Sequence, residues 1–183
     1  MKEIRIFICY ASDSEEECEA IKDIICDESN NHFEEKGYKF TPICWKDAIP
    51  GLGSPQEDKI DPLIVDSDCR LIILVLKNIL GTRYKYNQTG IEHEYSLAKK
   101  LNKDIMILRC DFRMRPSEID PEQLKNVNEF ILKAKNEGLI EDRISSNDDF
   151  KKTFRTKFAL WAKRLINMSQ NLSDKFKMQN RGF

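Results

Sequence analysis

The feature that most constrains the fold is an almost wholly apolar, β-branched run, RLIILVL, at residues 70–76. A strand with one face in water alternates apolar and polar residues, whereas this run is apolar at nearly every position. It therefore predicts a central strand that is covered on both faces. Such strands belong to parallel sheets, in which helical crossovers connect one strand to the next.

The remainder of the chain alternates between strand-like and helical patterns, as a parallel sheet requires. The expected strands span residues 4–9, 39–45, 70–76 and 104–108, with 139–140 as a short edge strand. The expected helices begin at Ser12, at the Ser54-Pro55-Gln56-Glu57 capping box, and at Thr89, Pro121 and Asp148. We therefore expect an α/β protein with a central parallel sheet of four to five strands, flanked by helices through right-handed crossovers.

Length and charge restrict the domain count and the partners. The chain has 183 residues, of which 40% are hydrophobic and 33% charged, so one globular domain is expected over residues 1–168. The periodicity is lost from residue 169, so residues 169–183 are expected to be a flexible C-terminal tail. Lys and Arg total 30 against 31 Asp and Glu, so we expect no nucleic-acid partner.

The N-terminus and the cysteines bear on the compartment. The opening MKEIRIFICYASDSEEE has too short an apolar run and too many acids for a signal peptide, and no apolar run approaches the ~20 residues of a membrane span. The 6 cysteines include no CxxC pair, as expected of reduced, buried thiols. We therefore expect a cytoplasmic protein without a membrane partner.

The stretch NQTGIEHEYSLAKKL, at residues 87–101, places an acidic residue inside an apolar helical stripe. At helical period, one side of this helix is formed by Ile91, Tyr95, Ala98 and Leu101. Glu94 projects between the last two, and a carboxylate there must be desolvated, paired or used. The alternative is that Glu94 lies at the margin of the stripe and reaches water. His93 points to the polar face and is expected to be solvated.

Ligands of parallel α/β sheets bind at the carboxyl ends of the strands. Three loops leave that edge, at residues 10–14, 46–54 and 77–90, and the Glu94 helix begins directly after the third. Glu94 is therefore expected about one turn from the rim of the crevice. The composition of the second loop fits a turn that contacts another molecule closely. The alternative is that this loop simply connects two elements and that its Trp45 packs in the core.

Several other chemistries lack their motifs. Gly51 and Gly53 do not follow GxGxxG, and no GxxxxGK[ST] occurs, so neither nucleotide-binding loop is indicated. His32 and His93 stand at no metal-ligand spacing, so no metal is expected. The central strand ends VLK, without the Asp that a receiver-type phosphoacceptor needs.

Together these residues resemble the Toll/interleukin-1 receptor (TIR) domains, particularly the bacterial effector branch. IFICYASD resembles the first TIR box, KDAIPG is similar to the second box, RDxxPG, with Lys in place of Arg, and Phe158 and Trp161 resemble the aromatic third box. The strings WKDAIPGLGSPQ, TGIEHEYSLA and DPEQLKNVNEF extend the resemblance over residues 4–165. The loop RYKYNQ at 83–88 departs from the small-residue turn of the family, which bears on substrate contacts.

The resemblance implies a flavodoxin-like three-layer fold and points to Glu94 as catalytic. In catalytic TIR domains a glutamate on the helix after the third strand, in an E-aromatic/aliphatic-x-x-A context, cleaves NAD⁺, and EYSLA at 94–98 matches it. NAD⁺ is then the substrate, and no cofactor is expected. The carboxylate stabilises a ribosyl oxocarbenium ion, and a hydrogen-bond partner is needed to keep it ionised against an apolar wall. The candidates for substrate contacts are Tyr10, Ala11, Ser12, Trp45, Asp47 and Gly51.

Three classes of function remain. The first is an NAD⁺ glycohydrolase or cyclase that self-assembly activates, used in antiphage defence or signalling together with a separate sensor or receptor protein. The second is a non-catalytic scaffold that binds other TIR domains through residues 46–54. The third is a deoxyribosyltransferase-like enzyme with a covalent Glu nucleophile. The TIR boxes favour the first two, and Glu94 favours the first; the sequence specifies neither the product nor the trigger.

Overall fold

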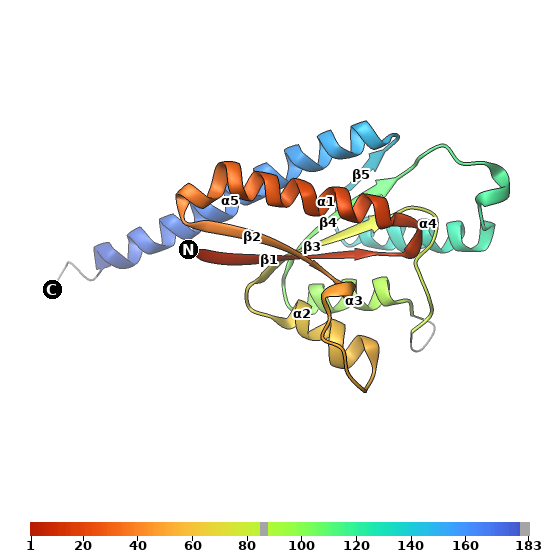
Figure 1. Cartoon of the computed structure of the whole chain (residues 1–183), viewed down its shortest axis with the longest axis horizontal. Helices are drawn as coiled ribbons and strands as arrows, with labels where there is room; N and C mark the ends of the chain where they lie inside the picture. The colour runs from red at the N-terminus through yellow and green to blue at the C-terminus, as the bar shows by residue number, and fades with distance from the viewer. Residues whose placement is uncertain (85–87, 180–183) are drawn as a thin grey trace.

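The computed structural model describes residues 1–84 and 88–179, and this part of the chain contains one parallel sheet (Figure 1). Its strands are β1 Lys2–Tyr10, β2 Tyr38–Cys44, β3 Cys69–Leu76, β4 Asp104–Cys110 and β5 Glu141–Ile144. Their order is β2-β1-β3-β4-β5, with every neighbouring pair parallel. This is the flavodoxin-like order, so the α/β fold expected from the sequence is confirmed.

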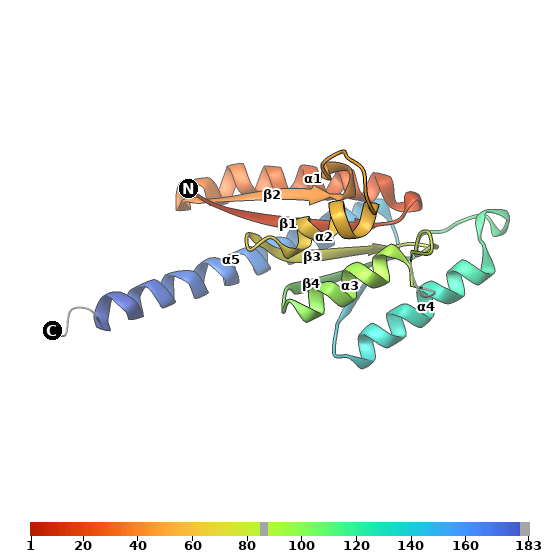
Figure 2. The same cartoon turned by 90° about the horizontal axis from the view of Figure 1, so that it is seen from below.

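Helices cover both faces of the sheet (Figures 1 and 2). The main helices are α1 Glu15–Glu28, α2 Asp61–Val65, α3 Gly90–Lys100, α4 Pro121–Asn136 and α5 Asn147–Gln179. One apolar core lies under α1 and α5, and the other lies under α2, α3 and α4. Alternate residues of β1 and β4 belong to the two cores, because successive side chains of a strand point to opposite faces.

Strand β3 lies in the middle of the sheet and is buried on both faces. All of its residues except Arg70 are buried, as the apolar run predicted. It pairs with β1 on one side and β4 on the other. Removal of this strand from water on both faces is a large favourable contribution to folding.

The last strand lies later in the chain than the sequence suggested. The edge strand was expected at residues 139–140, but β5 spans Glu141–Ile144. Gly138 has a φ of +93°, which ends α4, and the N–H of Leu139 turns back to the carbonyl of Ala134. Leu139 is therefore used in closing the helix, so pairing with β4 begins at Glu141.

Helix α5 continues beyond its expected end at residue 167 and reaches Gln179. The expected tail at 169–183 is thus helical as far as Gln179, and its flexibility stays a prediction. Figures 1 and 2 show this end of α5 running past the sheet. A helix without a core to cover needs no apolar stripe, which explains why the periodicity is lost there.

The two expected capping boxes have different outcomes. At α3 the box is confirmed, because Thr89 Oγ1 accepts from the N–H of Glu92 and Glu92 Oε2 accepts from the N–H of Thr89. At Ser54 it is wrong: the Ser54 side chain makes no cap bond, and its N–H donates to Asp58 Oδ2 at 2.7 Å. The chain then forms a wide helical turn, η5, at Pro55–Ile60.

The cysteines agree with the expectation of reduced, buried thiols except at Cys26. All 6 thiols are free, and Cys26 is the exposed one, whereas the other cysteines are buried. Within residues 1–84 and 88–179, no helix combines the length and apolarity needed to cross a membrane.

Candidate active site

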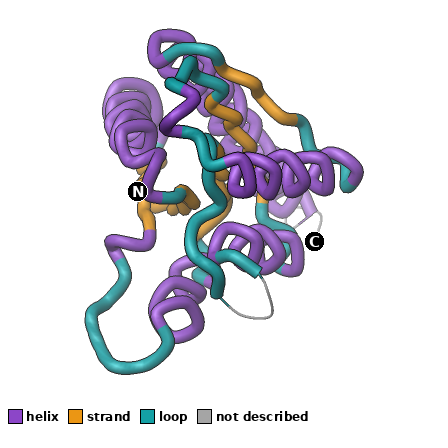
Figure 3. Tube along the Cα trace, turned by 90° about the vertical axis from the view of Figure 1, so that its right-hand side faces the viewer, coloured by secondary structure: helices purple, strands orange, loops and turns teal. Residues whose placement is uncertain are grey.

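The carboxyl ends of β1 and β3 lie where the strand order reverses, which is the ligand position in this class of fold. Figure 3 looks onto this carboxyl edge, where the loops lie in front of the strands. The loop after β1 is joined to the loop after β3 by Asp13, whose Oδ2 accepts from the N–H groups of Asn78 (2.8 Å) and Ile79 (3.2 Å). Asp13 looked like a helix-start residue in the sequence, but neither η1 (Ser12–Ser14) nor α1 has a side-chain cap bond.

Helix α3 places Glu94 on the inner side of its second turn. Ile91, Tyr95 and Ala98 are buried with it, and the Tyr95 hydroxyl donates to Glu137 beyond α4. Only 7% of Glu94 is exposed. The desolvated carboxylate expected from the helical pattern is therefore confirmed, and the alternative of a marginal, hydrated Glu94 is wrong.

Two polar side chains contact the Glu94 carboxylate. Gln56 of η5 donates from Nε2 to Glu94 Oε1 at 3.3 Å, and the Cys9 thiol of β1 hydrogen-bonds to the same carboxylate. Burial raises the pKa of Glu94 to about 7, and these two hydrogen bonds oppose that rise. Burial and the adjacent carboxylate raise the pKa of Cys9 well above its usual value, so Cys9 is a neutral donor.

The contacts continue from Gln56 to a carboxylate and an imidazole. Gln56 Nε2 also donates to Asp61 Oδ1 at 3.1 Å, and His93 Nε2 lies 3.0 and 2.9 Å from the two oxygens of Asp61. The expectation of a solvated His93 is wrong, because α2 packs beside α3 and brings Asp61 onto its ring. The ring also meets Tyr84 edge-on at 5.2 Å.

Three residues of this network were not expected beside Glu94 from the sequence. Gln56 and Asp61 stand in a polar segment and look like ordinary surface residues. Cys9 looks like one more apolar strand residue. A partial signal exists, because strand alternation puts Cys9 and Ala11 on one face and Tyr10 on the other.

Tyr10 and Trp45 lie together, but on the other face of the sheet from Glu94. Tyr10 belongs to the core under α1 and α5, whereas Cys9 belongs to the core under α3. The rings of Tyr10 and Trp45 are 6.2 Å apart, and Trp45 is 46% exposed rather than packed in the core. The structure therefore does not bring these expected stacking residues to the Glu94 carboxylate.

The other expected contact residues are divided between the end of β1 and the second loop. Ala11 is buried in the core that also contains Ile91 and Tyr95 of α3, and Ser12 is exposed at the rim. Asp47 accepts from the N–H of Cys44 at 2.7 Å and so holds the start of the loop. Gly51 is exposed, and its carbonyl accepts from Lys59. Of these residues, Ala11 is the one that belongs to the buried core under α3.

The tip of the second loop exposes apolar side chains. Leu52 is fully exposed at 101%, and Ile49 is exposed at 79%. The loop continues directly into η5, which carries Gln56. Any movement of this apolar tip is therefore connected through the chain to the Glu94 carboxylate.

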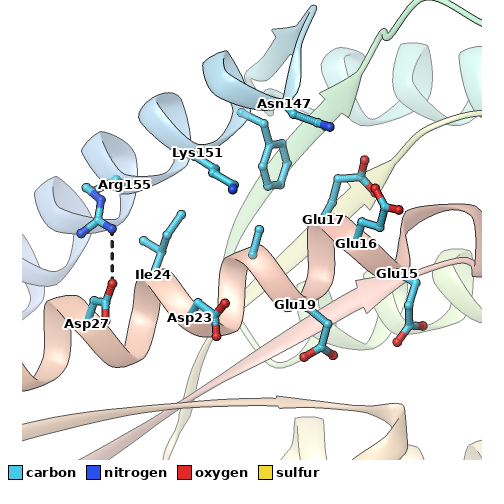
Figure 4. A pocket seen from close by; sticks show the side chains of 12 residues that line it. Glu15, Glu16, Glu17, Glu19, Asp23, Ile24, Asp27, Asn147, Lys151 and Arg155 are labelled. Carbon is cyan, nitrogen blue, oxygen red and sulfur yellow. Dashed lines mark ion pairs between the residues drawn. The ribbon is translucent and has the colours of Figure 1, made fainter.

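A cavity of about 600 Å³ lies between α1 and α5, on the face opposite Glu94 (Figure 4). Acidic side chains of α1 line much of it, and Arg155 of α5 pairs with Asp27 at 3.5 Å. Figure 4 shows Glu16 and Glu17 rising from α1 toward α5. This negative charge disfavours the binding of an anionic dinucleotide. We therefore do not assign this cavity to the substrate of the Glu94 site.

The chemical capacity of the site lies in its carboxylate. Within the described residues, no group of three or more His, Cys, Asp or Glu side chains is placed to hold a metal ion. A carboxyl group with a pKa near 7 is present both as a base and as an acid at neutral pH, and in its ionised form it stabilises an adjacent cation. Its amide and thiol neighbours favour the ionised form.

Two of the three comparisons with known proteins found no match. No family model matches the chain, and no curated protein matches its sequence. Among solved structures, the chain is similar to translation elongation factor SelB from Methanococcus maripaludis in its apo form, with 15% identity and a TM-score of 0.44. The similarity covers 86% of this chain and 35% of SelB, so the chain spans about a third of that protein. A likeness of this size indicates neither a family nor a function for this chain.

Proposed function

We propose that the protein is an NAD⁺ glycohydrolase of the TIR type, which cleaves the bond between nicotinamide and ribose through Glu94. The observation that supports this proposal most is the buried Glu94 carboxylate, whose pKa of about 7 leaves it half ionised at neutral pH. The resemblance of EYSLA at 94–98 to the catalytic context of TIR enzymes supplies the substrate. Glu94 lies on α3, the helix that follows the loop after β3.

The chemistry follows from the properties of the two reacting groups. The bond from ribose C1′ to the nicotinamide nitrogen breaks with its electron pair going to nicotinamide, which leaves as a neutral molecule. The remaining ribosyl oxocarbenium ion is stabilised by ionised Glu94. Water then attacks C1′, and its proton passes to the carboxylate, whose raised pKa suits it as an acceptor. Attack by another nucleophile in place of water gives a cyclic or base-exchanged product.

Substrate access requires a change at the site, because 7% exposure of Glu94 leaves no room for a ribose. The exposed apolar tip of the second loop supports self-assembly as the trigger, since Ile49 and Leu52 are available to a second copy. Docking of this tip would move η5, which is continuous with it and covers the carboxylate through Gln56. The proposal therefore includes activation by self-association.

The decisive experiment compares Glu94→Gln with Glu92→Gln on the same helix. Both substitutions keep the shape and remove one charge, and Gln at position 92 preserves the capping box. Concentrated protein is incubated with NAD⁺, and the products are separated by liquid chromatography. We expect Glu94→Gln to abolish NAD⁺ consumption with an unchanged circular dichroism spectrum, and Glu92→Gln to retain it. Equal turnover by wild type and Glu94→Gln would refute the assignment.

One observation favours a second candidate, a non-catalytic TIR scaffold. Glu94 is closed to solvent, whereas the loop tip with Leu52 is open to a partner. A scaffold would assemble through this loop and leave NAD⁺ intact at every protein concentration. Assembly measured by light scattering, with no loss of NAD⁺, selects this candidate.

A further inference from the structure

Gln56 is the polar group that closes over the Glu94 carboxylate. It is 6% exposed and comes from η5, 38 residues away from Glu94 in the sequence. Its amide nitrogen has two hydrogens, and it has two acceptors within reach, Glu94 Oε1 at 3.3 Å and Asp61 Oδ1 at 3.1 Å. One amide group thus joins two carboxylates on different helices.

Other residues restrict the orientation of the Gln56 amide. Asp61 is fixed by His93, whose Nε2 lies 2.9 Å from one carboxylate oxygen and 3.0 Å from the other. On its other side, Gln56 Oε1 lies against Gly90, where an added Cβ would be 3.4 Å away. Gln56 therefore has little freedom to turn its NH₂ group away from Glu94.

We propose that Gln56 is a positioning residue of this site: its amide, anchored by Asp61 and through Asp61 by His93, fixes the orientation of the Glu94 carboxylate and favours its ionised form. A carboxylate that accepts a hydrogen bond from a fixed donor is itself held in one orientation. The catalytic consequence of this role rests on the proposed function, but the contact itself does not.

The groups that face Glu94 from the neighbouring elements determine whether loss of Gln56 raises or lowers the pKa of Glu94. Cys9 of β1 and Gln56 of η5 donate to the carboxylate, and the charge of His93 on α3 also favours ionisation. Asp61 of α2 acts against it as a like charge. Loss of the Gln56 amide removes one of the two donors and leaves the burial unchanged, so the pKa of Glu94 must rise further.

The test is a pH titration of the Glu94 carboxyl carbon by ¹³C NMR in wild type and in Gln56→Met, which has similar volume and no donor. Glu94→Gln assigns the signal, and Gln123→Met on α4 is the matched control. We expect the midpoint in Gln56→Met to rise by about one pH unit, and Gln123→Met to match wild type. Identical midpoints in Gln56→Met and wild type would overturn the proposal.

Two further measurements cover the remaining outcomes. If Gln56→Met does not fold, the side-chain NH₂ signals of Gln56 in wild type must shift with the midpoint of Glu94, and signals that do not follow it refute the role. If NAD⁺ is cleaved, kcat of Gln56→Met should fall roughly tenfold below pH 7 and recover at alkaline pH. A loss that is equal at every pH indicates a merely structural residue. The NMR midpoints can be measured even when no NAD⁺ is consumed. Failure of the proposed function can therefore be distinguished from failure of the role proposed for Gln56.

Discussion

At the residue scale, the buried Glu94 carboxylate makes the fold sensitive to pH. In the unfolded chain the group ionises near its ordinary pKa of 4.5, whereas in the folded protein burial raises the pKa to about 7. Between these values the folded state binds the proton that the unfolded state has lost. Stability therefore falls as pH rises from 4.5 to about 7, and the loss is complete above that range.

This sign gives a prediction for Glu94→Gln. The amide cannot ionise, so the variant avoids this loss of stability. Its free energy of unfolding should exceed that of wild type by about 1–3 kcal/mol at pH 8 and should be close to that of wild type at pH 4. Urea denaturation at the two pH values measures this difference. Glu92→Gln, on the outer face of the same helix, should show no such pH-dependent gain. A Glu94→Gln protein that is less stable than wild type at pH 8 would mean that the carboxylate is held by more contacts than Gln56 and Cys9.

At the element scale, the two glycines of the second loop look alike in the sequence but have different roles in the structure. Gly53 has a φ of +112°, and a Cβ there would clash with the Asp58 carboxylate, which accepts from the N–H of Ser54. Gly51 has open space around its Cβ position. Gly53 is thus required by the backbone, and Gly51 is free to contact another molecule.

We therefore predict opposite effects at the two positions. Gly53→Ala should lower the melting temperature by several degrees, because the left-handed backbone and the contact with Asp58 are both disfavoured. Gly51→Trp should leave the melting temperature within about one degree, while it weakens self-association and turnover. Differential scanning fluorimetry and light scattering measure the two properties. Unchanged association of Gly51→Trp would remove this loop from the assembly surface.

The aromatic residues of α5 show how a family-like motif is used in packing. Phe158 is fully buried and meets Phe40 edge-on at 5.5 Å. The indole N–H of Trp161 donates to Asp104 at the start of β4, at 2.8 Å. These contacts fix α5 on the face of the sheet opposite Glu94, so these two residues position an element and do not contact the carboxylate.

At the scale of the whole molecule, Glu94 is closed to solvent and the loop tip is exposed, so the proposed function makes activity depend on assembly. If a second copy must displace η5, specific activity should rise more steeply than linearly with protein concentration and with a crowding agent. Initial rates of NAD⁺ loss from nanomolar to high micromolar protein, with light scattering on the same samples, measure this. Constant specific activity from a monomer throughout, with NAD⁺ bound, contradicts self-activation.

The local patterns of the sequence determined several parts of this protein by themselves. The apolar run at 70–76 predicted the buried strand β3, and the Thr89–Glu92 box predicted the start of α3. The helical period predicted that Glu94 faces inward. These features depend on residues within one or two turns of each other, and local spacing is what a sequence displays directly.

The tertiary structure alone decided which partners meet Glu94. The order of β2, β1 and β3 and the side on which α3 crosses bring Gln56 and Cys9 to the carboxylate and place Tyr10 on the opposite face. Gln56 and Glu94 are 38 residues apart, and no periodicity relates them. The physical reason is that contacts between elements depend on how the whole chain buries its apolar faces, whereas periodicity reports only which face of each element is apolar.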